Sequence, residues 1–295
     1  MSKNIAGKIK INSFADIVGG DEPSVTEILL TQLHDFNNHP FKVLDDEKMD
    51  ETVNSIKEHG VLIPGVVRPL MTGGYEIISG HRRKRACEIA GFETMPAIIK
   101  NYSDDEAVIA MVDSNIYRED ILPSEKARAY KMKYEAEKHQ GKETEKNGKT
   151  IELMASASGE SSKTIQRYIW LSRLSDILLQ MVDDKKLSFV CGVDLSFLKE
   201  KEQKWVEDVI EELSDTDGFR ISPAQSLKIK EYSNQNELSK ALVKEILSVE
   251  KQIQKKISFK REKLSQYFEE TTSDEEIENT IIELLEKWKR EKGDF

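Results

Sequence analysis

The chain has little of what marks a secreted or membrane protein. Its two cysteines, Cys87 and Cys191, stand far apart among 295 residues and in no Cys-x-x-Cys pair, which excludes a disulfide framework and a zinc knuckle. The longest mostly apolar stretch, 60–67, is interrupted by Pro64 and Gly65 and falls far short of the roughly 20 residues of a membrane-spanning helix. The first twenty residues lack the unbroken apolar core of a secretory signal. We therefore expect a cytoplasmic protein with no membrane partner.

Positive charge is also scarce. The 44 Lys and Arg residues face 54 Asp and Glu residues, for a net charge of -10. The excess negative charge is unevenly distributed along the chain, because residues 176–218 hold twelve acidic residues and only five lysines. Overall acidity argues against nucleic acid as a partner, but a local basic face can still hold phosphate. Charged residues make up 33% of the chain against roughly 25% in an average domain, which indicates a well-solvated, largely helical protein.

Apolar periodicity predicts an α+β domain followed by all-α regions. Strands are expected over 66–68, 75–78 and 97–99, and helices over 47–59 and 82–90. The predicted divisions are a flexible tail over 1–22, a first domain over 23–137, a linker over 138–149, a helical domain over 150–232 and a helical C-terminal region over 233–295.

A strand–glycine–helix junction is the most informative motif. The apolar strand ends at Gly80, and a helix begins at once with His81, Arg82, Arg83, Lys84 and Arg85. A helix N-terminus presents unpaired N–H groups and a positive dipole, and glycine lets an anion approach the backbone. Guanidinium groups at such a place suit phosphate. The alternative is a basic helix face that is only solvated.

A second polar cluster follows in 111–130. Asn115 and Arg118 are three residues apart and would share a helical face, with Asp113 nearby and Ser124 placed to cap the next helix. Carboxylate and amide oxygens beside an arginine suit a magnesium–nucleotide complex, with Asp113 and Asn115 as metal contacts. The alternative is a joint between two helices that carries surface charges.

Residues 151–174 have the spacing of a helix-turn-helix. Ala155 stands where two helices would touch, Gly159 in the turn and Ile165 in the core of the second helix. That second helix would enter the major groove, and the side chains predicted to face DNA are Ser161, Ser162, Lys163, Thr164, Gln166 and Arg167. An ordinary helical hairpin is the alternative.

Four segments in order resemble the ParB partition protein family over about residues 38–198. They are HPFKVLDDEKMDETVNSIKEHGVLIPGVVRPL, YEIISGHRRKRACEIAG, DSNIYREDILPSEKARAY, and the helix-turn-helix with RLSDILLQMVDDKKLSF. The resemblance implies a ParB/sulfiredoxin-like N-terminal domain, a helix-turn-helix domain and a C-terminal dimerisation region. It also implies a homodimeric clamp on double-stranded DNA with a centromere-like site, loaded with CTP and Mg²⁺, which works with a ParA-type ATPase in plasmid or chromosome partition.

The resemblance also assigns residues. The family's cytidine-contacting segment falls on 60–68, its G-E-R-R motif on 80–83 and its E-N-x-x-R motif on 114–118. The nucleotide-binding residues are therefore expected to be Arg68, Gly80, His81, Arg82, Arg83, Ser114, Asn115 and Arg118. His81 and Ser114 stand where the family usually has glutamate, and Ile63 replaces a common glutamine. We therefore expect nucleotide binding with at most weak CTP hydrolysis.

Rival functions remain open at this stage. One is a static DNA-binding regulator or replication adaptor that keeps the scaffold without a nucleotide switch, and another is a slow nucleotidase with DNA as cofactor. The C-terminal apolar stripe of Ile277, Ile281, Leu284, Leu285 and Trp288 fits either the core of a small domain or a dimer seam.

Overall fold

The computed structural model describes residues 24–118, 120–139, 147–213, 220–248, 261–264, 266–268 and 271–292. The chain divides into two compact units, 1–249 and 250–295. The expected tail over 1–22 and most of the expected linker, 140–146, lie outside the described residues. In the part of the chain that the structure describes, no helix is long and apolar enough to cross a membrane.

A five-stranded mixed sheet forms the N-terminal domain of the first unit. Its strands are β1 Val25–Leu29, β2 Leu33–His34, β3 Gly65–Pro69, β4 Tyr75–Ser79 and β5 Thr94–Ile99. They lie in the order β1-β5-β3-β4-β2. The β1/β5 and β3/β4 pairs are antiparallel, whereas β5/β3 and β4/β2 are parallel. The predicted strands are confirmed, each longer by one to three residues.

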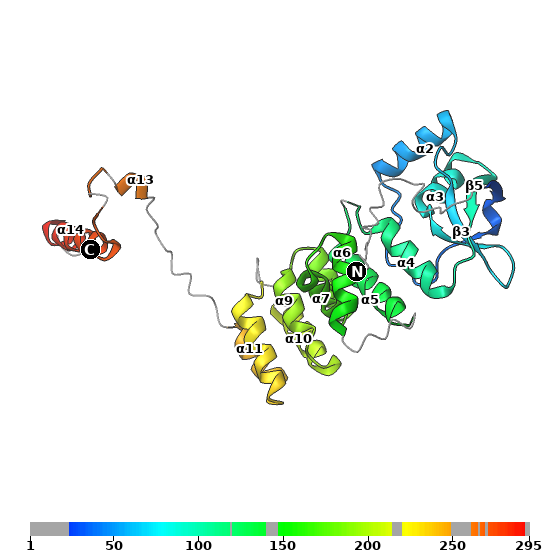
Figure 1. Cartoon of the computed structure of the whole chain (residues 1–295). Coiled ribbons are helices and arrows are strands. Elements are labelled where there is room, and N and C mark those ends of the chain that lie inside the picture. Colours follow the sequence, from blue (N-terminus) through cyan, green and yellow to red (C-terminus); the bar gives the residue numbers. More distant parts are fainter. Residues whose placement is uncertain are drawn as a thin grey trace, which may run out of the picture. The chain divides into compact units, whose positions relative to one another are not determined.

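Two helices, α2 (Glu47–His59) and α3 (His81–Ala90), pack on one face of this sheet (Figure 1). Helix α2 has the predicted bounds, because the carboxylate of Asp46 accepts a hydrogen bond from the Met49 N–H at one end and Gly60 ends it at the other. Its buried residues join Ala86 and Cys87 of α3 against the strands. This packing fixes the N-terminus of α3 beside the end of β4.

The other face of the sheet contacts the helical part of the chain. Helix α4 (Asp104–Asn115) begins with a capping box between Ser103 and Glu106 and packs against β4. Helix α5 (Pro123–His139) lies against α4. The predicted capping role of Ser124 is wrong: Pro123 already starts the helix, and the Ser124 N–H and hydroxyl both donate to Asp183, at 2.9 and 2.5 Å.

Among the described residues of the first unit, seven more helices follow α5. They are α6 Asn147–Ser158, α7 Ser162–Leu171, α8 Asp176–Asp183, α9 Phe189–Leu195, α10 Glu200–Leu213, α11 Pro223–Asn234 and α12 Lys240–Ser248. The expected fold class, α+β followed by all-α, is confirmed. A continuous apolar cluster runs from Phe36, Phe41 and Ile78 through α4 and α5 to Ile165 of α7. The sheet and the α6–α7 pair therefore share one core.

Several carboxylates of the acidic segment pair with lysines inside this helical region. Asp208 and Glu212 of α10 form ion pairs with Lys240 of α12 at 3.1 and 3.2 Å, and Asp194 pairs with Lys230 of α11 at 3.2 Å. These carboxylates join helices to each other, so part of the segment's negative charge is compensated within the fold.

The second unit contains α13 (Arg261–Leu264) and α14 (Asp274–Lys292). Helix α14 has a capped start, because Glu276 and Ser273 exchange hydrogen bonds at 3.1 and 3.3 Å. Along its apolar stripe Ile277 is buried, whereas Leu284 is 62% and Leu285 57% exposed.

Candidate nucleotide pocket and DNA interface

The N-terminus of α3 has no side-chain cap. Gly80 occupies the N-cap position with φ 117°, in the left-handed region that favours glycine. A Cβ atom on Gly80 would lie 3.3 Å from the Cα of Gly65, so two backbones cross here without side chains between them. Helices α2, α4 and α7, in contrast, are each capped by a side chain. The unpaired N–H groups at the start of α3 are therefore left for an external acceptor such as phosphate.

His81 begins α3 and is held as a neutral imidazole. Burial lowers its pKa to about 3, and the neighbouring His39 acts in the same direction. The two rings stack with centroids 4.0 Å apart, and the Phe36 N–H approaches Nε2 of His81 at 3.4 Å. Burial also lowers the pKa of His39, and the positive charge of Arg118 adds to that effect. Arg118 thus lies close enough to this histidine pair to act on it electrostatically.

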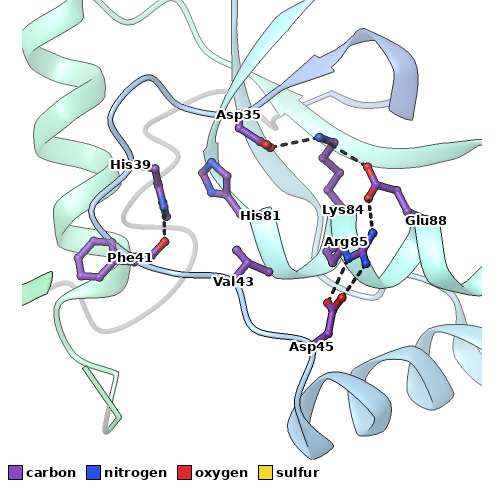
Figure 2. A pocket seen from close by; sticks show the side chains of 9 residues that line it. All are labelled: Asp35, His39, Phe41, Val43, Asp45, His81, Lys84, Arg85 and Glu88. Carbon is purple, nitrogen blue, oxygen red and sulfur yellow. Dashed lines mark hydrogen bonds and ion pairs between the residues drawn. The ribbon is translucent and has the colours of Figure 1, made fainter. Parts of the chain in front are cut away.

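A pocket of about 330 Å³ opens beside this pair (Figure 2). One wall is the face of α3 that carries His81, Lys84, Arg85 and Glu88, and the other is the chain between β2 and α2. Its lining residues are Asp35, His39, Phe41, Val43, Asp45, His81, Lys84, Arg85 and Glu88. Both cations are paired: Lys84 with Asp35 at 3.1 Å, and Arg85 with Asp45 at 2.6 Å. A triphosphate would have to displace these carboxylates to use them.

The two arginines of the predicted phosphate motif have different surroundings. Arg83 is half-buried, and desolvation lowers its pKa; its guanidinium donates to the backbone carbonyls of Ile63 and, at 2.7 Å, Pro64. Arg82 is partly exposed and only approaches Asp46, at 3.5 Å. Arg82 is therefore the side chain of this motif that can reach a ligand, whereas Arg83 holds the loop before β3.

Arg68 is committed to other partners. Its side chain is 14% exposed and forms ion pairs with Glu76 and Asp104, each at 2.6 Å. The structure therefore does not bring Arg68 together with the α3 N-terminus as a ligand-directed side chain, although the sequence grouped them.

The second motif lies at the end of α4. The helix ends at Asn115, so the predicted shared helical face of Asn115 and Arg118 is wrong, and Arg118 lies in the following turn. Ser114 and Asn115 both donate to the carbonyl of Met111 at 2.9 Å. Arg118 is exposed and forms no ion pair with any residue that the structure describes. Of these three, Arg118 is the best placed to meet an anion.

The described residues do not fit a protein-held metal. No group of three His, Cys, Asp or Glu side chains among them could hold an ion. Asp113, a predicted metal contact, forms an ion pair with Lys133, whose side chain is 6% exposed. Any magnesium ion here would need the oxygens of a bound phosphate as its main ligands.

Helices α6 and α7 pack against each other, with Gly159 in the turn between them at φ 70°. Ile165 is buried in the core, where the sequence placed it, and Ile169 is buried with it. Ser161 caps α7 and its hydroxyl lies 2.8 Å from that of Thr164, so these two are engaged locally. Lys163 is exposed and Gln166 and Arg167 are half-buried, and none of the three bonds to another described residue through its side chain.

Sequence reasoning missed two residues that shape the site. His39 was one of five scattered histidines, and nothing in a separation of 42 residues predicts its stacking on His81. Glu125 was overlooked, although glutamate three residues after a helix start is a capping signal. It is 6% exposed and accepts hydrogen bonds from the backbone N–H groups of Lys42 and Leu122, at 2.8 and 3.1 Å.

Comparison with known proteins identifies relatives of this chain. The family model of the ParB N-terminal domain matches residues 16–116. The nucleoid occlusion protein of Halalkalibacterium halodurans is 32% identical over 195 residues, 65% of each chain. The stage 0 sporulation protein J of Bacillus subtilis is 33% identical over 191 residues, 65% of this chain and 64% of that one. The chain thus spans slightly under two thirds of the length of these relatives.

A solved structure of ParB from Caulobacter crescentus complexed with CTP-gamma-S is 26% identical, with a TM-score of 0.31. It covers 59% of this chain and 92% of that one. The family-model match and the curated relatives together show that the chain belongs to the ParB family.

Proposed function

We propose that this chain is a sequence-specific DNA-binding protein of a plasmid or chromosome partition system that binds CTP and closes on DNA as a homodimeric clamp. The observation that carries the proposal is the uncapped N-terminus of α3, which packs on one face of a sheet whose other face shares an apolar core with the α6–α7 pair. An anion site and a DNA-reading helix in one cooperative unit are what a nucleotide-controlled DNA clamp requires.

The DNA side of the proposal rests on α7. Lys163 would hold a phosphate, whereas Gln166 and Arg167 have the side chains that pair adenine and guanine in the major groove. Their target would be a double-stranded, centromere-like site, which would associate the protein with the nucleoid.

The nucleotide side rests on Gly80, Arg82 and Arg118. The backbone at Gly80 would receive a phosphate at the helix N-terminus, and the two arginines would neutralise its charge. Magnesium would bind with the triphosphate and stabilise its charge. Because Ser114 bonds within its own helix and brings no carboxylate, we propose nucleotide binding with weak hydrolysis at most.

The second unit is proposed to hold the dimer together. The apolar stripe of α14 is mostly exposed, as Leu284 and Leu285 illustrate, and a second copy of the helix would cover it. A ParA-type ATPase is the proposed partner of the assembled clamp.

A static regulator on the same scaffold is the second candidate. It is favoured by His81, which is buried and neutral, and by the cations of the pocket, which are already paired with carboxylates. In that case the charged groups of the pocket would be neutralised by its own side chains, and no nucleotide would be needed.

Footprinting separates the two candidates. A duplex selected from a random pool by the full chain would be probed with and without CTP and Mg²⁺. A clamp should protect its site and then spread into flanking DNA only when nucleotide is present. Protection of one site that CTP leaves unchanged would support the static regulator instead.

A further inference from the structure

The first turn of α5 joins three segments through three consecutive residues. Ser124 donates twice to Asp183 of α8, and Lys126 forms an ion pair with Glu160 in the turn between α6 and α7. Between them, Glu125 bonds the backbone of Lys42 in the chain that connects β2 to α2. One helical turn therefore contacts the pocket wall on one side and the DNA-binding helices on the other.

Glu125 is placed to transmit a displacement between the Lys42 backbone and the first turn of α5. It stands at the third position of α5, where a carboxylate is favoured by the helix dipole and can reach back to the N-cap N–H, here that of Leu122. Its second oxygen accepts the Lys42 N–H at 2.8 Å. Burial of the Glu125 carboxylate makes both bonds costly to leave unmade, because a buried acceptor without donors loses its hydration. The carboxylate and the Lys42 backbone must therefore move together.

The Lys42 backbone belongs to the wall of the pocket. Residues 35–46 form no helix or strand, so side-chain bonds rather than a sheet ladder set their position. Phe41 and Val43, on either side of Lys42, both line the pocket (Figure 2). Phe41 is also part of the apolar cluster that includes Ile165 of α7. Shifting Lys42 would therefore change the shape of the pocket.

We propose that Glu125 is a positioning residue that couples occupancy of the pocket to the state of the helix-turn-helix. The nature of the pocket's ligand rests on the function proposed above, but the coupling itself does not. Because coupling between two sites is reciprocal, DNA bound at α7 should alter the pocket wall as much as a ligand in the pocket alters DNA affinity.

Hydrogen exchange of the full chain tests the coupling without nucleotide. Adding the selected duplex should slow exchange of residues 36–45 by roughly fivefold or more, a typical coupling of one to three kcal/mol. Glu125→Gln keeps only one acceptor oxygen for two N–H groups, so this response should be largely lost. Glu135→Gln makes the same change at an exposed position of α5 and should keep the response. An unchanged response in Glu125→Gln, or none in the wild type, would overturn the proposal.

A second variant distinguishes a loss of coupling from a loss of folding. Lys126→Met breaks the link to Glu160 without touching Glu125, and its side chain is partly exposed, so the fold should tolerate it. It should also lose the DNA-induced response at 36–45 while keeping the Lys42 amide protected in free protein. If the response persists, Glu125 does not act through this turn and the proposal is wrong.

Nucleotide binding provides an arm that distinguishes the two proposals. The affinity for CTP with Mg²⁺ should rise on adding the duplex in the wild type and in Glu135→Gln, but not in Glu125→Gln. If no protein binds CTP while the exchange response follows the pattern above, the CTP function fails and the coupling stands. If CTP binds and its affinity responds to DNA equally in all three proteins, the coupling role of Glu125 fails alone.

Discussion

Arg82 and Arg83 are adjacent in the sequence but have different structural roles. Arg83 turns inward to two backbone carbonyls, whereas Arg82 stays near the surface beside Asp46. In the sequence they belong to one run of four basic residues, and nothing in that run tells which member faces the sheet. The structure therefore separates a loop-holding arginine from a ligand-directed one.

Replacing Arg83 should reduce stability. Arg83→Met leaves the carbonyls of Ile63 and Pro64 without their charged donor, and we expect the free energy of unfolding to fall by about 1–3 kcal/mol. Arg82→Met makes the same change at a partly exposed residue and should alter stability by less than about 0.5 kcal/mol. Urea denaturation of both variants checks this. Equal losses of stability in the two variants would show that Arg83 stabilises the fold no more than Arg82 does.

The half-buried histidine pair predicts an acid-sensitive fold. Burial lowers the pKa of His81 from 6.5 to about 3, so the unfolded chain takes up a proton below pH 6.5 that the folded chain does not. Stability is therefore full above pH 6.5 and falls as the pH drops. Between pH 7 and 5, His81 should contribute a loss of about 2 kcal/mol.

Urea denaturation at both pH values measures this loss. His81→Gln cannot titrate, so it should lose about 2 kcal/mol less than the wild type on going from pH 7 to 5. Identical losses in the two proteins would mean that His81 is not held neutral by its burial against His39.

Helix α7 is the element proposed to read DNA. Ile165 and Ile169 are buried in the core, whereas Arg167 is half-buried and is proposed to face the major groove. Arg167→Ala should cost about 1–3 kcal/mol of binding at the selected site if it reads a base. Titrations on the selected duplex and on random DNA check this. An equal loss on both would make Arg167 a phosphate contact.

The bounds of a helix were predicted well where neighbouring residues in the sequence set both of its ends. The sequence predicted a helix over 47–59, and in the structure Asp46 and Gly60 set these bounds of α2. The end of α4 was harder, because no glycine or proline follows Asn115 at once. The partners of His81 and Arg68 could not be predicted, since they depend on contacts between residues far apart in the chain.

The whole molecule is expected to be a dimer through its second unit. Leu285→Asp places a charge on the exposed apolar stripe of α14 and should shift the protein from dimer to monomer, because a buried unpaired charge is costly. Light scattering over a range of concentrations measures the mass. Glu286→Asp, a charge-conserving change at the next position of α14, is the control. A dimer that persists in Leu285→Asp would place the interface elsewhere.

The nucleotide switch is the property on which the function of the whole molecule depends. Equilibrium binding of CTP, ATP, GTP and UTP with Mg²⁺ should be measured for the wild type, Arg82→Ala and the exposed control Arg220→Ala, each with and without the selected duplex. We expect CTP-selective binding that Arg82→Ala abolishes and Arg220→Ala preserves. Absence of nucleotide binding under every condition would contradict the clamp and leave a static DNA-binding protein on a ParB scaffold.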